Sequence, residues 1–581
     1  MRTSLPATLA LSVGLASSNF LSFKRQQAVT NAYVPTTTSC PTSPLIRSAE
    51  SLNSREKDYV SQRSTKASQA LSSWLSTALE GFSTEDVPAL ALALSGGGTK
   101  AGLTTAGAVY GLDGRESSDS PTAGLLQSMT YVSALSGGSL TLSGIMANDF
   151  AQVSTLRTDL LDQSYQNAFA AVLSNADAVR ADVGNKTAAG FPATLIDVYG
   201  KVISYNFITA SGGNDLHWSA ITSQSSFENH DAPFPIITIT QTNVPAGMCE
   251  PNSDSAIWEV SPLEFGSWDD KVDAFYPTQY MGTTSNSTSG QCLTGYDNTG
   301  FITAISSNIL NNASACDAGN GTTADLNELS TTVNTAFPGI ALVNPYGIIP
   351  NPFYQSSEAG IIRDQAQLFG TDGGDSGQAI PVFPWLQPER EVDVIFLIDA
   401  ATQQPGNMTN GTWLYNTYTS AQEKGLTKMP EVPTPADFIA QNLSARAQFY
   451  GCHDANVTTL IYLPNTEEGD APTGFFNTPA ELNGTFDGGV SMVTQSQSGV
   501  KPEEWAACVA CAIVHKTAAE LPEVCGGCLE RYCWPRNGTD GGSGSGSGNG
   551  TEGAPTPSTG GGARVQISVF ALAATVLALL L

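Results

Sequence analysis

The feature that most constrains the fold is an apolar segment that ends at a serine followed by two glycines. Residues 130–135 read as a buried strand, and residues 138–146 read as a helix. Ser136 lies between them, where the chain must turn from strand to helix within very few residues. Such a turn needs small neighbours, and Ala134 and Gly138 supply them, with alanine in a place where glycine is more usual. The pattern predicts a nucleophile elbow with Ser136 at its apex.

A second apolar segment ends in a run of glycines. Residues 87–94 read as a buried strand, and Ser95 and three glycines follow at once. Consecutive glycines let backbone N–H groups come close to a bound atom, as an oxyanion hole for acyl transfer requires. Gly97 and Gly98 are the candidate donors. A flexible turn is the structural alternative, and a nucleotide phosphate loop is disfavoured because no Gly-Lys-Ser/Thr follows.

Strand and helix patterns alternate along much of the chain. Further apolar segments that read as buried strands lie at 235–240, 391–398 and 458–463. Helical patterns cover 54–82 and about 434–450, the second opened by an N-cap threonine and a proline. This alternation predicts an α/β fold with three layers, α/β/α, around a mostly parallel central sheet. Residues 250–360 are rich in Asn, Ser and Gly and read as long insertion loops on the same core.

The charge of the chain argues against one class of partner. The sequence has 53 acidic and 25 basic residues, a formal net charge of −28. Such a chain is repelled by polyanions, so we expect no nucleic-acid partner. The same charge argues against tight electrostatic docking on anionic lipid. We interpret it as a solubility device in an acidic, extracellular setting.

Both ends of the chain read as targeting signals. Residues 1–18 contain an apolar stretch behind a basic residue, which predicts a secretory signal peptide. Residues 567–581 are apolar, are short for a spanning helix, and follow a Gly/Ser/Thr/Pro stalk at 538–562. They predict a removed GPI-signal tail with the anchor site within 549–558, and a plain transmembrane tail is the alternative. We therefore expect a GPI-anchored protein of the secretory pathway, at the plasma membrane outer face or cell wall, or released extracellularly.

Ten cysteines and eleven sequons fit an exported chain. Cys508-x-x-Cys511 and Cys525-x-x-Cys528 have the spacing of a zinc ribbon, but disulfides are favoured in an oxidising compartment. The cysteine-rich segment 508–533 holds five cysteines, so at least one must pair outside it. The predicted N-glycosylation sites are Asn185, Asn286, Asn312, Asn320, Asn407, Asn410, Asn442, Asn456, Asn483, Asn537 and Asn549.

A serine nucleophile needs a base, and the histidines of this chain suit the role poorly. There are four of them, His217, His230, His453 and His515. In α/β-hydrolase triads the histidine follows the serine and the acid, and the two late histidines here lie beside or among cysteines. A carboxylate acting directly on the serine is another arrangement, and Asp372, followed by two glycines, suits it. A triad that uses His453 stays an alternative.

Several motifs occur along the chain in the order of one known family. They are Leu94-Ser-Gly-Gly-Gly98, Gly124-Leu-Leu-Gln-Ser128, Leu135-Ser-Gly-Gly-Ser139, Pro262-Leu-Glu-Phe-Gly-Ser-Trp-Asp269, Asn351-Pro-Phe353, Asp372-Gly-Gly-Asp-Ser-Gly-Gln378 and Gln387-Pro-Glu-Arg-Glu-Val-Asp-Val-Ile395. On these motifs the chain resembles the fungal phospholipase B (lysophospholipase) family, which is related to the catalytic domain of cytosolic phospholipase A2. The resemblance covers residues 33–534 and implies one catalytic domain there.

The resemblance implies an esterase that hydrolyses the acyl ester of lysophospholipids at a membrane or micelle surface, with diacyl phospholipids as an open extension. By position, Ser136 matches the nucleophile, Asp372 its dyad partner, and Gly97 and Gly98 the oxyanion-hole glycines. The family's phosphate-binding arginine falls on Lys100, which keeps the charge but loses the planar, two-pronged grip on phosphate.

No cofactor or metal is needed for this chemistry, and Asp375 is read as structural. The rival hypothesis is a weak or inactive surface glycoprotein on the same scaffold. It is motivated by two departures from the family pattern, Lys100 and Ala134.

Overall fold

The computed structural model describes nine stretches of the chain, and the ends lie outside them. The described residues are 32–116, 119–168, 170–242, 251, 254–284, 290–308, 346–401, 408–466 and 477–535. The predicted signal peptide, stalk and GPI-signal tail therefore lie outside the described residues. Among the helices that are described, none combines the length and the apolar character needed to cross a bilayer.

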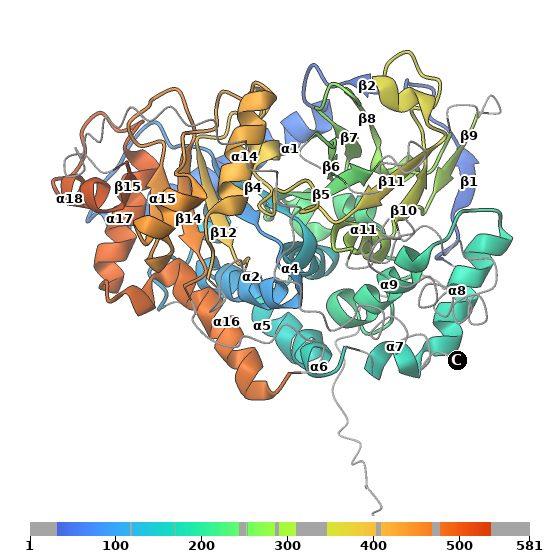
Figure 1. Cartoon of the computed structure of the whole chain (residues 1–581), viewed down its shortest axis with the longest axis horizontal. Coiled ribbons are helices and arrows are strands. Elements are labelled where there is room, and N and C mark those ends of the chain that lie inside the picture. The colour runs from blue at the N-terminus through green and yellow to red at the C-terminus, as the bar shows by residue number, and fades with distance from the viewer. Residues whose placement is uncertain are drawn as a thin grey trace, which may run out of the picture.

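Five parallel strands form the centre of the main sheet (Figure 1). In spatial order they are β14 (Thr459–Pro464), β12 (Val394–Asp399), β3 (Leu90–Leu94), β4 (Met129–Ala134) and β5 (Phe234–Thr242). All but one of their residues are buried, which explains why these segments are rich in apolar residues and could be recognised in the sequence. The predicted α/β fold with a parallel central sheet is confirmed.

Antiparallel strands extend the sheet on both sides. Beyond β5 lie β6 (Ile257–Val260), β7 (Glu264–Ser267), β8 (Ala274–Pro277) and β2 (Arg47–Ser48). Beyond β14 lie β13 (Gln448–Tyr450), which is antiparallel to β14, and β15 (Cys533–Trp534), which is parallel to β13. The prediction of loops over 250–360 was therefore wrong in part, because strands of the main sheet occupy 257–277 and 347–350.

Helices cover both faces of the sheet (Figure 1). On one face α16 (Pro479–Thr494), α2 (Gly98–Leu112), α4 (Ser136–Ala147), α11 (Thr299–Ser306) and α9 (Leu195–Ile203) pack side by side. On the other face lie α1 (Ser54–Ala78) and α14 (Thr412–Glu423). Crossovers between parallel strands are right-handed, so the direction in which the chain moves across the sheet decides which face the connecting helix covers. The chain moves from β3 to β5 in one direction and from β12 to β14 in the other, so the two sets of connecting helices lie on opposite faces.

The helix predicted over 434–450 is much shorter. Helix α15 covers Pro435–Ala440, with the Thr434 side chain accepting a hydrogen bond from the N–H of Asp437. Asn442 then has a φ of 51°, a left-handed conformation that ends a helix. The remaining residues include strand β13, whose Phe449 is fully buried, so pairing in the sheet replaces the helical continuation.

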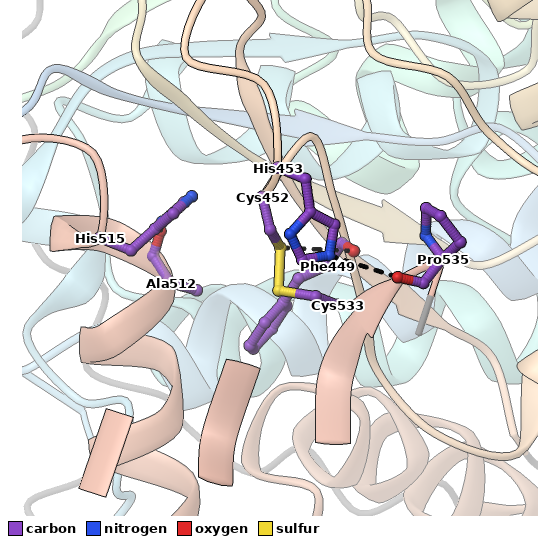
Figure 2. The surroundings of a disulfide bond; sticks show 7 residues. All are labelled: Phe449, Cys452, His453, Ala512, His515, Cys533 and Pro535. Carbon is purple, nitrogen blue, oxygen red and sulfur yellow. Dashed lines mark hydrogen bonds between the residues drawn. A yellow bond between two sulfur atoms is a disulfide. The ribbon is translucent and has the colours of Figure 1, made fainter. Parts of the chain in front are cut away.

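Disulfides hold the cysteine-rich segment, as the sequence predicted. Cys508 pairs with Cys528 and Cys511 with Cys525, which joins α17 (Pro502–Val514) to α18 (Val524–Tyr532). All four cysteines of the zinc-ribbon alternative are disulfide-bonded, so none is left as a thiolate ligand for zinc. Cys533 is the cysteine that pairs outside the segment, with Cys452 (Figure 2).

The fourth described disulfide joins Cys40 to Cys292, next to the two-stranded sheet of β1 (Thr36–Ser39) and β9 (Gln291–Thr294). Cys249 and Cys316 lie outside the described residues. Of the sequons, Asn185, Asn442, Asn456 and Asn483 are exposed and Asn410 is half-buried. The sequons outside the described residues are Asn286, Asn312, Asn320, Asn407, Asn537 and Asn549.

Candidate active site

Two strands that meet end to end create the site. Strand β5 pairs with β6 along one edge, and with both β4 and β11 (Gln367–Thr371) along the other. Strand β4 pairs as far as Ile237, and β11 arrives from the opposite direction and pairs down to Thr240. The chain leaves β4 toward Ser136 and leaves β11 toward Asp372. The sheet itself thus brings together two residues that are 236 positions apart in the sequence.

Ser136 adopts the strained backbone that an elbow requires. Its φ is 47°, in the left-handed region that residues other than glycine rarely enter. Close packing on both sides leaves no room to relax. A methyl group on Gly137 would lie 2.2 Å from the carbonyl oxygen of Gly98, and one on Gly138 would lie 2.5 Å from the carbonyl oxygen of Leu94. The two glycines after the serine are therefore required by contact, as the sequence predicted.

The backbone N–H of Ser136 has a partner that the sequence analysis missed. It donates a hydrogen bond to Oγ of Ser306 at 3.1 Å, and that hydroxyl donates to the carbonyl oxygen of Thr238 at 2.8 Å. Ser306 ends α11 and is fully buried. The hydroxyl of Ser306 thereby connects the elbow to the middle of β5.

The glycine run lies against the elbow. A methyl group on Gly96 would lie 2.7 Å from Cβ of Ser136, so this glycine is in direct contact with the serine. Gly97 and Gly98 both have positive φ, 133° and 71°, and helix α2 begins at Gly98. A helix start concentrates unpaired N–H groups and a partial positive charge, which favours an anion there. Around the position of a Gly98 methyl group there is open space within 4 Å.

Asp372 faces the serine from a half-buried position. Its Oδ1 accepts a hydrogen bond of 2.8 Å from the N–H of Gly374. Burial, and next the negative charge of Asp375, hold the pKa of Asp372 well above its usual range, while hydrogen bonding from Gly374 and from the hydroxyl of Ser136 acts in the opposite direction. A carboxyl group with a raised pKa is a stronger base than an ordinary aspartate when it is ionised.

Asp375 is hydrogen-bonded at the end of β11. Its Oδ2 accepts a hydrogen bond from Thr371 at 2.8 Å, and Thr371 also accepts one from Asn308.

The phenol of Tyr199, on α9, lies near Asp372. Its pKa is raised to about 12, chiefly by burial and further by the charge of Asp372.

Lys100 lies in the first turn of α2, two residues after Gly98, and is buried. Burial of a lysine is expensive unless an anion or polar group offsets it. Lys100 thus follows the candidate oxyanion donors Gly97 and Gly98 closely, on the helix that begins at Gly98.

The histidines do not gather at Ser136. His453 follows β13, four strands from β4 in the sheet order, or about 19 Å at the usual strand spacing. Strand β13 is antiparallel to β14, so its end lies at the opposite edge of the sheet from Ser136. Figure 2 shows His453 and His515 beside the Cys452–Cys533 disulfide. His453 contacts the carbonyl oxygen of Pro535, and His515 contacts that of Ala512.

The other two histidines are also placed elsewhere. His230 comes before β5 and stacks at a tilt on Tyr59, at the amino ends of the parallel strands. His217 bridges to Asn298 at the start of α11, and Ser306 ends that helix. The geometry gives the triad with His453 no support.

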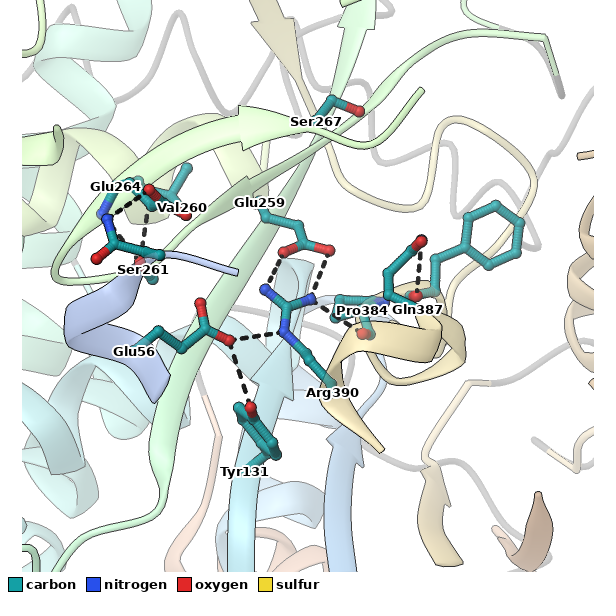
Figure 3. Close-up of polar contacts among 12 residues, drawn as sticks. Glu56, Tyr131, Glu259, Val260, Ser261, Glu264, Ser267, Pro384, Gln387 and Arg390 are labelled. Carbon is teal, nitrogen blue, oxygen red and sulfur yellow. Dashed lines mark hydrogen bonds and ion pairs between the residues drawn. The ribbon is translucent and has the colours of Figure 1, made fainter. Parts of the chain in front are cut away.

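A buried ion-pair network holds the amino ends of the strands, opposite the site (Figure 3). Arg390, which comes shortly before β12, donates two hydrogen bonds to Glu259 at 2.7 and 3.0 Å and one to Glu56 at 2.8 Å. Glu56 also accepts one from the hydroxyl of Tyr131. Burial raises the pKa of Glu56, and Arg390 opposes that rise. Because removing one partner would leave a buried charge, the network ties α1, β4, β6 and β12 into one unit.

A cavity of about 650 Å³ adjoins this network. Its walls include Glu259, Trp268, Asp269, Lys271, Phe383 and Lys424, and neither Ser136 nor Asp372. The two lysines are already paired, Lys424 with Asp269 at 2.6 Å and Lys271 with Asp254 at 2.7 Å. The cavity is therefore separate from the candidate catalytic residues.

A serine elbow at the carboxyl edge of a parallel-centred sheet, next to a glycine-rich helix start, defines the class of α/β carboxylic ester hydrolases. The family model described as "Lysophospholipase catalytic domain" matches residues 90–539. The chain is 32% identical to the lysophospholipase of Penicillium chrysogenum, which covers 88% of this chain and 92% of the relative. It is 33% identical to lysophospholipase 1 of Candida albicans, which covers 87% and 89%. The chain belongs to the lysophospholipase family and is an enzyme of that family.

A solved structure shares the fold at low sequence identity. Human GIVD cytosolic phospholipase A2 is similar with a TM-score of 0.56 and 17% identity, over 85% of this chain and 72% of that one. At that identity the likeness shows the fold alone. It agrees with the resemblance inferred from the motifs.

Proposed function

We propose that this enzyme hydrolyses the acyl ester of lysophospholipids through a dyad of Ser136 and Asp372, and that diacyl phospholipids are further substrates. The substrate class follows from the family and from the names of its relatives. One observation carries the mechanism. The hydroxyl of Ser136, a serine in the strained elbow conformation, lies near enough to the half-buried carboxylate of Asp372 to lower its pKa by hydrogen bonding.

The reaction has two halves. In the first, Oγ of Ser136 attacks the ester carbonyl carbon, and its proton passes to Asp372. The N–H groups of Gly97 and Gly98 hold the oxyanion of the tetrahedral intermediate. As the bond to the glycerol oxygen breaks, that oxygen takes the proton from Asp372 and leaves as a hydroxyl group. In the second half, Asp372 accepts a proton from water, which attacks the acyl-serine ester. The bond between the acyl carbon and Oγ of Ser136 then breaks, Asp372 returns its proton to Oγ, and free fatty acid leaves.

Lys100 is the proposed contact for the lipid phosphate. Its ammonium group supplies a point charge, without the two-pronged geometry of arginine. The start of α2 adds favourable potential for an anion at the same place. No cofactor or metal takes part in these steps.

The direct test measures fatty-acid release from lysophosphatidylcholine by the purified ectodomain. Ser136→Ala and Asp372→Asn should each lower kcat by about a thousandfold or more, because the nucleophile and its base act as a unit. Asp375→Asn is the comparison: it removes a charge that raises the pKa of Asp372 but leaves the base in place, so it should shift the acid side of the pH profile to lower pH and lower kcat far less. If the wild type releases no fatty acid from lyso- or diacyl-lipids, the inactive surface glycoprotein replaces this proposal.

The role of Lys100 needs a comparison of two substrates. Lys100→Met should raise KM for lysophosphatidylcholine and leave kcat/KM for a phosphate-free p-nitrophenyl ester much less affected. Lys100→Arg should lower KM for the phospholipid if a two-pronged grip helps. Equal losses on both substrates would show a packing role for this buried lysine.

We further propose that the mature chain is N-glycosylated and attached by a GPI anchor to the outer face of the plasma membrane or to the cell wall. The four exposed sequons described above support the first part. Release of the enzyme from intact cells by phosphatidylinositol-specific phospholipase C tests the anchor, and a mass shift after endoglycosidase treatment tests the glycans.

A further inference from the structure

A fully buried carboxylate, that of Asp399, lies behind the glycine run. Asp399 ends β12, the strand next to β3, and is fully buried. Its Oδ2 accepts a hydrogen bond of 2.6 Å from the hydroxyl of Tyr462 on β14, and its Oδ1 accepts one of 3.1 Å from the N–H of Ala401. The chain that leaves β12 therefore turns back at Ala401, whose N–H is held by the side chain of Asp399.

The segment that Asp399 holds is in contact with the candidate oxyanion donors. A methyl group on Gly97 would lie 3.2 Å from Cα of Ala401 and 3.4 Å from the carbonyl oxygen of Ala400. The N–H of Ala400 donates a hydrogen bond of 2.8 Å to Oγ of Ser95, the residue that begins the glycine run. Backbone at Ala400 and Ala401 therefore forms the surface against which Gly97 rests.

An ionisable group is an unusual choice for this position. The groups that face Asp399 are two tyrosines, Tyr462 and, at a greater distance, Tyr450 on β13, whose ring lies 6.0 Å from that of Tyr462. Both pKa values are raised by burial, so both phenols stay neutral. Burial raises the pKa of Asp399 to about 6, against the opposing hydrogen bonds from Tyr462 and Ala401. Asparagine could accept one of these hydrogen bonds through its carbonyl oxygen and donate another from its amide to the phenol oxygen, without the cost of burying a charge.

We propose that Asp399 is a positioning residue for the oxyanion hole, which in its ionised form fixes the Ala400–Ala401 backbone beneath Gly97 and on protonation loosens it. This inference rests on the proposed roles of Ser136 and Gly97. It predicts that a second carboxyl group, outside the dyad, contributes to the fall of kcat/KM at acid pH.

The experiment is the pH dependence of kcat/KM between pH 4 and 8 on a soluble p-nitrophenyl ester. In the wild type, Asp372 and Asp399 must both be ionised. The logarithm of kcat/KM should therefore fall on the acid side with a slope that steepens from one toward two, and Asp399 contributes near pH 6. Asp399→Asn should remove that contribution, so the slope stays at one.

Tyr462→Phe tests the same idea without touching the carboxyl group. Removing the donor takes away a hydrogen bond that favours the ionised form, so the contribution of Asp399 should move to higher pH. Tyr450→Phe is the matched control, a neighbouring buried tyrosine, and should leave the profile in place. This pair keeps the test decisive if Asp399→Asn fails to fold.

The outcomes separate the two proposals. If Ser136→Ala and Asp372→Asn are inactive but Asp399→Asn keeps the wild-type slope, only the role of Asp399 is wrong. If Asp399→Asn changes the free energy of unfolding without changing the profile, the residue is purely structural. If Ser136→Ala keeps full activity, the proposed function fails first. As a readout without turnover, the rate of Ser136 labelling by a p-nitrophenyl phosphonate should show the same pH dependence.

Discussion

Ser306 accepts a hydrogen bond from the backbone N–H of Ser136, so the last residue of α11 holds the first residue of α4. The bond matters because Ser136 has a φ of 47° and would relax if it could. Ser306 is in turn held by the carbonyl oxygen of Thr238 on β5. The strained serine is therefore anchored to β5, the strand that also pairs with β11.

Replacing Ser306 by alanine should slow the enzyme more than it destabilises the fold. The N–H of Ser136 would lose its acceptor, a cost of about 1–3 kcal/mol, which corresponds to a fall in kcat of about 5- to 150-fold if the cost is felt in the transition state. Steady-state kinetics and urea unfolding measure the two effects. Thr303→Val is the control, one turn earlier on α11, where the hydroxyl bonds Ser143 and Thr299. Equal losses of activity in both variants would contradict the prediction.

Asp372→Asn should stabilise the folded protein while it removes activity. The native pKa of Asp372 is raised, so the native state binds this proton more tightly than the unfolded chain does. Wild-type stability therefore falls as pH rises from about 4 through the native pKa. The asparagine variant avoids that fall, and we expect a gain of about 1–3 kcal/mol at pH 7 that vanishes near pH 4. Urea titrations at both pH values would measure it, and a loss of stability at pH 7 would refute it.

Gly97→Ala and Gly98→Ala should differ in severity. At Gly97 a φ of 133° and the contact with Ala401 both oppose a side chain, so we expect poor folding and little activity. At Gly98 the space is open, and the left-handed backbone costs a residue with a side chain about 1–2 kcal/mol. That variant should fold and lose activity through crowding of the oxyanion. Thermal unfolding and the phosphonate labelling rate distinguish the two, and similar behaviour of both would be inconsistent with this geometry.

Removing disulfides should affect stability according to the length of chain that each closes. The Cys452–Cys533 bond spans 81 residues and Cys511–Cys525 spans 14. Loop-closure entropy gives about 4.5 kcal/mol for the first and about 3 kcal/mol for the second. Double Cys→Ser variants measured by urea unfolding should follow that order. Both should keep kcat near wild type, since β13 lies four strands from β4.

The sequence predicted the parallel strands well and the antiparallel ones poorly, for a physical reason. Strands such as β3 are buried on both faces and consist only of apolar residues. Strands β6 and β7 include Glu259 and Glu264, which are buried but paired with Arg390 and Arg47. A charged residue in a short segment reads as solvent-exposed when its partner is more than 100 positions away. The strands of 257–277 were therefore taken for loops.

The residues of the candidate site also divide into those that the sequence predicted and those that it missed. Ser136, Gly97 and Gly98 could be found because local backbone chemistry demands small residues beside them. Ser306 could not, because its role arises from the packing of α11 against the elbow, and a lone serine at a helix end carries no signal. Asp399 is hidden for the same reason, since it reads as the polar end of a strand. Only the sheet order places it behind the glycine run.

The order of strands also bears on how the chain is made. Strand β3 lies between β4, which follows it closely, and β12, whose entry is marked by a hydrogen bond between residues 304 positions apart, Ala89 and Asp393. At about 5–20 residues per second, the ribosome needs about 15–60 s to deliver that missing neighbour. During that interval the backbone groups along one edge of β3, an entirely apolar strand, have no strand to pair with. The nascent enzyme should therefore depend on chaperones during synthesis, and slower translation should lengthen that dependence.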